Sequence, residues 1–288
     1  MKESGKASVR RISKALEEPV STIGRWCAPS ASVPLEMTSP RPGRTDPRVT
    51  ELILVLCEED RNRKHGHRRI RALLNRRYGL HVNRKTVYRI MKAQGLLQEK
   101  LRYKQFRTGL VSKMTPDAPN HGWQVDMTSF KLSDMTTLYL EIVIDCCTRK
   151  IVGWNLDRRC RAKEWIAAVR TALENQGLIG SEDCRFLTIR SDNGAQPCSK
   201  DFVAYLYENG VAGEYTGYNA PNDNAFVERV MRTIKEEEIW ANQYDSWAEA
   251  HQAVEKYITY YNSERIHSAL NYRTPNEAEA DWMSQSAA

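Results

Sequence analysis

Three carboxylates lie in sequence contexts that suit metal-dependent chemistry. Asp126 falls inside a stretch whose apolar and polar residues alternate as in a strand. Asp192 follows a second apolar stretch, and Asn193 and Gly194 can turn the chain there so that the carboxylate projects from the strand end. Glu228 lies within a helical pattern. Each acid is therefore expected on a rigid element.

Phosphoryl transfer on a nucleic acid is the chemistry that such a set of acids could perform. It uses two divalent cations about 4 Å apart, and hard cations of this kind take oxygen ligands. Magnesium keeps several waters and shares phosphate oxygens with its substrate, so three carboxylates are enough to hold a pair. Helix caps and surface ion pairs are the alternative in a chain with 36 acidic residues, so spacing and context must decide.

The elements that would position these acids follow from hydrophobic periodicity and turn residues. The patterns predict strands at 123–130, 138–145, 151–156 and 185–190, and helices at 163–176, 200–208, 224–239 and 247–262. The cap of the helix that carries Glu228 is predicted at Asn222 or Asp223. Strands in succession, followed by alternating helices and strands, predict a mixed α/β sheet with helices packed on it.

Positive charge is concentrated in one segment, residues 61–107, which we call the basic segment. It holds 16 Lys and Arg against one acid, whereas the rest of the chain holds 27 basic and 35 acidic residues. The formal net charge of +7 therefore hides a strong local excess. Such a block can dock a polyanion that releases its condensed counterions on binding, so the expected partner is nucleic acid.

The basic segment has the pattern of a helix, a turn and a second helix. The first helix is expected to close near Gly79 and the second to begin after Asn83 as N-cap. A helical pair with a solvated charged surface is the alternative, but the charge imbalance and the turn favour DNA binding. Four residues of the second helix face away from its apolar stripe, as a major-groove recognition helix requires: Arg84, Lys85, Tyr88 and Lys92.

Composition indicates a reduced protein in the cytoplasm, associated with the nucleoid. The seven cysteines include no Cys-x-x-Cys pair, so neither a disulfide framework nor a zinc ribbon is predicted. The N-terminus is polar and basic, and no stretch approaches the ~20 apolar residues of a membrane span. Residues 9–26 carry a helical pattern, and the Pro- and Ser-rich residues 29–47 are expected to form a linker.

Four ordered segments resemble one known family over roughly residues 65–283. They are His65-Gly-His-Arg-Arg-Ile70, the strand-turn region 144–154, the pair formed by Asp192 and Glu228 with 35 residues between them, and a C-terminal signature at 261–275. The signature holds Tyr-Asn-x-x-Arg-x-His-x-x-Leu followed by Thr-Pro. The chain thus resembles insertion-sequence transposases encoded by the second open reading frame, whose catalytic core is shared with DDE transposases and retroviral integrases.

The resemblance implies a fold and an activity. Together with the sequence patterns, which predict a short helical segment and linker at 1–50, it implies a small all-α helix-turn-helix domain at 51–114 and an RNase H-like catalytic domain at 115–285. Asp126 and Asp192 on the sheet and Glu228 on a helix would hold two Mg²⁺ or Mn²⁺ ions. The activity would be cleavage and joining of DNA strands at element ends, with water and then a 3′-hydroxyl as nucleophile.

Partners also follow from the resemblance. Double-stranded DNA of the element ends and of the target is expected, and a homo-oligomer is expected because two ends must be joined. A companion protein from the first reading frame is a further candidate, since the region before residue 60 lacks a heptad-rich helix. The zinc-binding His-His-Cys-Cys pattern of retroviral integrases is absent from the sequence, which argues against a retroviral protein.

Polar neighbours of Glu228 are candidates for supporting roles. Asn224 lies four residues before it, on the same helix face, and could either orient a ligand or cap the helix. Arg232 and Lys235, four and seven residues after Glu228, are expected to contact the DNA backbone. For Asp145 we favour a hydrogen-bonding structural role over metal binding.

Other conspicuous residues are interpreted as structural. Trp123 and Trp154 are expected in the core, and Arg265 and His267 are expected to pack over the catalytic domain. Two competing functions remain: a DNA-binding regulator that lacks productive chemistry, which the intact acids disfavour, and a structure-specific nuclease, which the C-terminal signature disfavours.

Overall fold

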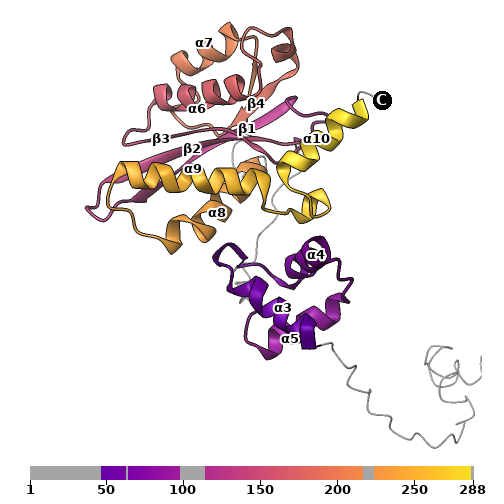
Figure 1. The fold of residues 1–288 in the computed structure, drawn as a ribbon. Coiled ribbons are helices and arrows are strands. Elements are labelled where there is room, and N and C mark those ends of the chain that lie inside the picture. Colours follow the sequence, from indigo (N-terminus) through magenta and orange to yellow (C-terminus); the bar gives the residue numbers. More distant parts are fainter. Residues whose placement is uncertain (1–46, 63, 98–113, 217–223, 287–288) are drawn as a thin grey trace, which may run out of the picture. The chain divides into compact units, whose positions relative to one another are not determined.

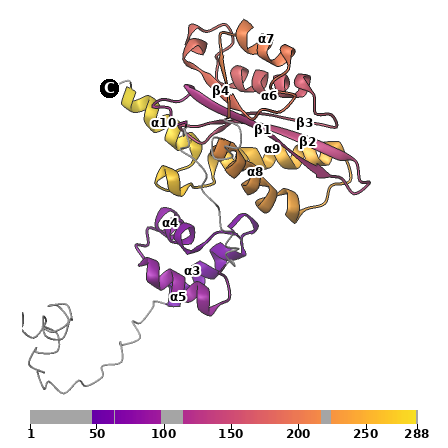
Figure 2. The same cartoon turned by 180° about the vertical axis from the view of Figure 1, so that it is seen from behind.

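The computed structural model describes residues 47–62, 64–97, 114–216 and 224–286, and Figures 1 and 2 show them from opposite sides. The helical pattern predicted at 9–26, the linker up to residue 46, and the candidate caps Asn222 and Asp223 lie outside the described residues. Pro47 begins a helix, ahead of the domain boundary predicted at residue 51.

The basic segment contains the predicted helix-turn-helix. α3 (Pro47–Glu58) and the short η1 (Asp60–Asn62) precede α4 (His67–Tyr78) and α5 (Arg84–Ala93). α4 ends at Gly79, which has φ +65° and donates its N–H to the carbonyl of Asn75. The Asn83 side chain accepts a hydrogen bond from the Lys85 amide at the start of α5. Both predicted caps are thereby confirmed.

A five-stranded mixed sheet follows. Its strands are β1 (Gly122–Lys131), β2 (Thr137–Asp145), β3 (Ile151–Asp157), β4 (Thr188–Ser191) and β5 (Ala212–Tyr215). They lie in the order β3-β2-β1-β4-β5, and the first three are antiparallel, as successive strands can be. β4 pairs with β1 and β5 with β4 in parallel. The first three predicted strands are confirmed.

Helices cover both faces of the sheet (Figures 1 and 2). α6 (Ala162–Asn175) and α7 (Lys200–Glu208) pack on one face with Trp123 and Val125, while α8 (Ala225–Glu237) and α9 (Trp247–Ser263) pack on the other with Phe130 and Ile142. Successive residues of β1 therefore serve opposite cores. This is the RNase H-like mixed sheet, with a small all-α domain ahead of it, that the resemblance implied.

The fold differs from the predicted elements at three places. Of the strand predicted at 185–190, residues 188–190 belong to β4, but residues 185 and 186 end η2 (Glu182–Phe186), where the Ser181 hydroxyl accepts the Asp183 amide and starts a 3₁₀ turn. β5 was not predicted, and all four of its residues are exposed. The C-terminal region adds η4 (Ile239–Ala241), η5 (Ser268–Leu270) and an unpredicted helix, α10 (Pro275–Ser286).

Candidate active site

Asp126 lies on the central strand of the sheet. It pairs with Ile142 of β2 and belongs to the face that α8 covers. Its Oδ1 accepts a hydrogen bond of 2.7 Å from the Met127 amide. Burial, together with the negative charges of Asp192 and Glu228, raises the pKa of Asp126 to about 6, against opposing effects of the Met127 amide and Lys235. The charges of the other two acids therefore reach Asp126.

Asp192 comes directly after β4, on the neighbouring strand. Gln124 of β1 pairs in parallel register with Arg190 of β4, and Asp126 and Asp192 each lie two residues further on. The two acids are thus level on strands that run about 4.8 Å apart. The exposed Asp192 accepts the Gly194 amide at 3.1 Å, and Asn193 donates to the Thr216 carbonyl at 2.7 Å. The turn predicted after Asp192 is confirmed.

Glu228 lies in the first turn of α8 and is exposed, although partial burial raises its pKa. The start of α8 is held to β1 by two side chains. The buried Gln124 accepts hydrogen bonds from the amides of Phe226 and Val227 at 3.0 and 3.1 Å. Asn224 donates to the Val125 carbonyl at 3.3 Å. The helix is therefore anchored beside Asp126.

Asn224 is thus neither a side-chain cap nor shown to be a ligand-orienting group. It occupies the cap position of α8 without a side-chain cap hydrogen bond, and it is 4% exposed. Its Oδ1 has no hydrogen-bond partner among the described residues. Gln124 performs the capping instead, and sequence reasoning missed it. The signal was present, because Gln124 is a polar residue two positions before Asp126 and so on the same strand face.

The cations predicted after Glu228 have different surroundings. Lys235 lies close enough to Asp126 for its charge to oppose the rise in that pKa. Arg232 is exposed and donates from Nε to Oε1 of Glu236 at 2.8 Å, an ion pair one turn along the same helix. The charge of Lys235 therefore reaches Asp126, whereas Arg232 forms an ion pair within α8.

The candidate recognition residues lie on the exposed face of α5. The buried side chains of the helix, Val87 and Met91, pack into the core of the helix-turn-helix domain. Tyr88 also makes an edge-to-face contact with His67, their ring centroids being 5.2 Å apart. The predicted residues Arg84, Lys85, Tyr88 and Lys92 are all exposed, and so is Arg89, which was not predicted.

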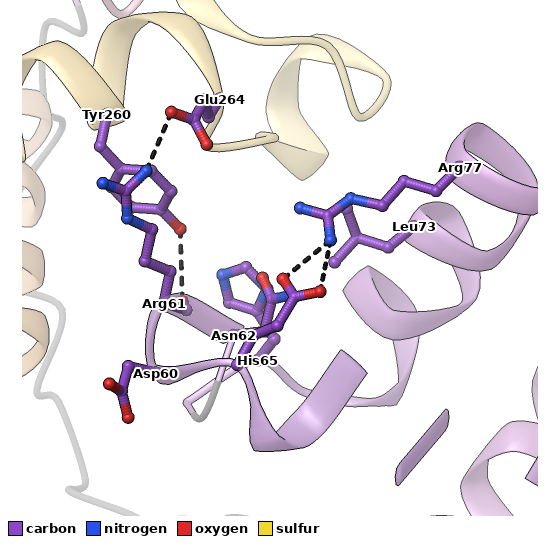
Figure 3. Close-up of a pocket in the computed structure, with 9 residues that line it drawn as sticks. Asp60, Arg61, Asn62, His65, Leu73, Arg77, Tyr260 and Glu264 are labelled. Atoms are coloured by element: carbon purple, nitrogen blue, oxygen red, sulfur yellow. Dashed lines mark hydrogen bonds and ion pairs between the residues drawn. The ribbon is translucent and has the colours of Figure 1, made fainter. Parts of the chain in front are cut away.

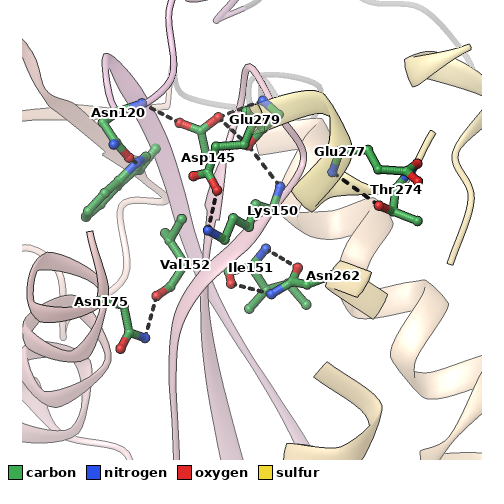
Figure 4. Close-up of polar contacts among 12 residues, drawn as sticks. Asn120, Asp145, Lys150, Ile151, Val152, Asn175, Asn262, Thr274, Glu277 and Glu279 are labelled. Carbon is green, nitrogen blue, oxygen red and sulfur yellow. Dashed lines mark hydrogen bonds and ion pairs between the residues drawn. The ribbon is translucent and has the colours of Figure 1, made fainter. Parts of the chain in front are cut away.

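Asp145 has the hydrogen-bonding surroundings of a structural residue (Figure 4). It is 1% exposed, and its carboxylate accepts the amides of Asn120, Cys147 and Thr148 together with the Thr148 hydroxyl. These bonds close the turn that follows β2. Trp123 is fully buried, and Trp154 packs partly buried against the core and against His251, as expected for core aromatics.

The donor set of the candidate site fits a hard divalent cation. Within the described residues, no group of three or more His, Cys, Asp or Glu side chains is gathered closely enough to hold one ion in this arrangement. The buried Asp126, however, has its pKa raised by two neighbouring carboxylates. A cation there would offset that repulsion, and carboxylate oxygens are the ligands that magnesium prefers.

Comparison with known proteins agrees with this architecture. Residues 116–219 and 209–275 match two families described as integrase core domains, and residues 45–105 match an HTH-like domain. These matches define the class of protein, an integrase-type core with a helix-turn-helix domain ahead of it. No helix in the described part of the chain is long and apolar enough to cross a membrane.

Two curated relatives identify the family more closely. The transposase for insertion sequence element IS904 of Lactococcus lactis is 32% identical over 247 residues, which cover 80% of this chain and 93% of the relative. The putative transposase InsK for insertion sequence element IS150 of Escherichia coli is 29% identical over 243 residues, covering 80% and 82%. The chain belongs to the insertion-sequence transposases, proteins of DNA transposition and recombination.

Solved structures that match part of the chain include viral integrases. A chain of a simian T-cell lymphotropic virus intasome matches with a TM-score of 0.48 and 17% identity, over 73% of this chain and 70% of that chain. The HTLV-2 integrase catalytic core domain, solved with magnesium, matches with a TM-score of 0.44 and 20% identity, over 57% and 98%.

Proposed function

We propose that this transposase cleaves DNA strands at the ends of its element and joins them to a target in a Mg²⁺- or Mn²⁺-dependent reaction. Asp126, Asp192 and Glu228 are the proposed catalytic residues and the ligands of two ions. One observation carries the proposal: Asp126 and Asp192 are level on neighbouring parallel strands, and the charge of Glu228 on α8 acts on Asp126.

The bound ions would supply activation of the attacking oxygen and stabilisation of the leaving oxygen. The chain's own part is to hold carboxylates and phosphate in place. Gln124 keeps α8 against β1, which fixes Glu228 relative to Asp126. Lys235, whose charge reaches Asp126, is placed to contact a DNA phosphate beside the acids. Asn224 and the exposed Arg232 are further candidates for DNA contact.

The helix-turn-helix domain is proposed to bind the element ends. Arg84, Lys85, Tyr88 and Lys92 form an exposed face that would enter the major groove, while positive charge around it holds the phosphates. Joining two ends requires two bound DNA segments, so we propose a homo-oligomer on DNA, with a companion protein of the first reading frame as a further partner.

Strand cleavage tests the proposal. A labelled duplex that carries the flanking ends of the element is incubated with Mg²⁺ or Mn²⁺ and the wild-type chain, Glu228→Gln or Asp192→Asn. We expect metal-dependent cleavage by wild type and a loss of at least about a hundredfold in both variants, because each removes a proposed ligand. Glu255→Gln on α9 and Asp201→Asn on α7 are matched controls at exposed positions and should cleave like wild type.

Each other outcome has a definite meaning. Cleavage that persists in Asp192→Asn would remove the acidic triad from the mechanism. Cleaved products without joined products would favour a nuclease. Binding without cleavage by wild type, with the companion protein added, would favour a DNA-binding regulator.

A further inference from the structure

Two sequence motifs that contain none of the three acids, the motif at 65–70 and the C-terminal signature at 261–275, meet at the end of α8. Arg265 of the C-terminal signature is 3% exposed and donates to both carboxylate oxygens of Glu237, from Nη2 at 2.7 Å and from Nε at 2.8 Å. The Tyr257 hydroxyl of α9 donates to the same carboxylate at 2.8 Å. Glu237 is the last residue of α8, the helix that carries Glu228.

The helix-turn-helix domain reaches the same carboxylate. Arg69 of the His65-Gly-His-Arg-Arg-Ile70 motif lies with Nη1 at 3.7 Å from Oε1 of Glu237. The two side chains are only 25% and 13% exposed, so water screens the pair weakly. One carboxylate of α8 therefore binds an arginine from the C-terminal signature and an arginine from the DNA-binding domain.

Further contacts join the same two surfaces (Figure 3). Arg61 donates to Glu264 at 2.9 Å, and the Tyr260 hydroxyl donates to the Arg61 carbonyl at 3.3 Å. A cavity of about 410 Å³ lies between them, and the buried His65 lines it. Ile266 is 1% exposed and belongs to the hydrophobic core of the helix-turn-helix domain.

The helix-turn-helix domain uses its basic residues on two different faces. On the face that contacts the catalytic domain, arginines pair with glutamates. Arg76 of α4 also pairs in this way with Glu277 of α10, with one contact at 2.9 Å. α5 keeps its recognition face exposed. The docked arginines are therefore used within the chain, while the DNA-reading residues remain outside the contact.

We propose that Arg69 and Glu237 are positioning residues: their contact docks the DNA-binding domain on the end of α8 and thereby sets which phosphodiester, counted from the recognised sequence, reaches the acids. The inference rests on the proposed function. Gln124 anchors the first turn of α8 and Arg69 reaches its last residue, so a single helix links the recognition domain to Glu228.

The position of cleavage is the readout that distinguishes this role from a purely structural one. Arg69→Gln leaves Glu237 with Arg265 and Tyr257, so the fold of the catalytic domain should persist. Arg68→Gln is the matched control, because it removes the same charge from the adjacent exposed position of α4. We expect equal binding of end DNA by the two variants, but in Arg69→Gln a roughly five- to tenfold loss of cleavage at the wild-type position, with cuts at neighbouring positions.

Rescue of a second contact provides an independent test of docking. Arg61→Glu and Glu264→Arg should each scatter the cuts, and the double variant should restore the single position because the ion pair is re-formed with reversed signs. One unchanged cleavage position in Arg69→Gln and in both single reversals would overturn the inference.

Failure of the proposed function would be seen separately. If wild type does not cleave, hydrogen exchange of the amides in the last turn of α8 tests the docking contact without a cleavage assay. Faster exchange in Arg69→Gln than in Arg68→Gln would support the docking contact, and equal exchange in the two variants would overturn it.

Discussion

Asp126 is a carboxylate held where its charge is unfavourable. It lies on a central strand beside two further acids, and burial raises its pKa to about 6. Such a position costs folding free energy and serves no packing purpose, since a neutral residue of the same shape would avoid the repulsion. The arrangement is understandable when the carboxylate must be ionised beside a cation, as a metal ligand is.

The pH dependence of stability follows from this shift. The folded chain holds the Asp126 proton until about pH 6, whereas the ordinary pKa of an aspartate is 3.8. The protonated form's contribution to stability is therefore complete below about pH 4 and is lost as pH rises through 6. Without divalent metal, Asp126→Asn should gain about 1 to 3 kcal/mol of unfolding free energy at pH 8 and almost none at pH 4.

Denaturant unfolding at the two pH values measures the gain. Asp134→Asn is a control of opposite sign, because hydrogen bonds from Thr136 lower the pKa of Asp134, so this variant should gain nothing at pH 8. An Asp126→Asn variant no more stable than wild type at pH 8 would contradict the electrostatic coupling of the three acids.

The placement of the three acids on a strand, at a strand end and on a helix could be predicted from sequence, but the contacts that hold these elements together could not. Asp192 and Glu228 stand in motifs whose turn and helix are local features. Gln124 acquires its role only because α8, which begins 101 residues later, places the amides of Phe226 and Val227 beside it. No periodicity in the sequence encodes that pairing, and Asn224 was the more obvious candidate.

Elements whose ends are set by local chemistry were predicted well. Gly79 and Asn83 define α4 and α5 because a left-handed residue ends a helix and an asparagine side chain caps the next. β5 was missed because it has four exposed residues and depends on pairing with β4. The domain boundaries at 50 and 114 stay predictions.

The capping of α8 by Gln124 gives a prediction for that element. Gln124→Ala removes the acceptor of two amides at the helix start and should cost about 1 to 2 kcal/mol of unfolding free energy, as the loss of a helix cap does. Strand joining should fall more than DNA binding, because only the placement of Glu228 changes. Gln252→Ala, at an exposed position of α9, is the control and should match wild type in both assays.

The contact between β3 and α6 depends on a missing side chain. A Cβ at Gly153 would lie 2.5 Å from the Ala168 carbonyl oxygen and from the Ala172 amide nitrogen, both backbone atoms of α6. Gly153→Ala must therefore push the helix from the sheet, and we expect a loss of about 1 to 3 kcal/mol in unfolding free energy. Gly66→Ala is the matched control, since its Cβ would meet nothing within 4 Å. Equal denaturation midpoints for the two variants would contradict the close packing.

At the scale of the whole molecule, ion pairs connect the basic segment to the catalytic domain. The basic segment docks some of its arginines on glutamates of the catalytic domain and presents others to solvent. Glu237 is the centre of this arrangement, because α4, α9 and the C-terminal signature all reach its carboxylate. The sequence predicted that Arg265 packs over the catalytic domain, but its ion pair with a residue 28 positions earlier lay beyond local patterns.

Removal of this charge should therefore unfold more than one helix. Burial alone would raise the pKa of Glu237, but hydrogen bonds and charge from Arg265, with Tyr257 and Arg69, lower it to about 2. Its contribution to stability is present above 4.5, the ordinary pKa of a glutamate, and is lost as pH falls toward 2. Glu237→Gln leaves Arg265 buried without its carboxylate, so we expect a loss of about 3 to 5 kcal/mol of unfolding free energy at pH 7 that shrinks below pH 4.

Glu236→Gln is the control, because its partner Arg232 is exposed, and it should lose less than about 1 kcal/mol of unfolding free energy. Denaturant titrations of the two variants that coincide at pH 7 would mean that Glu237 is not the junction between the domains.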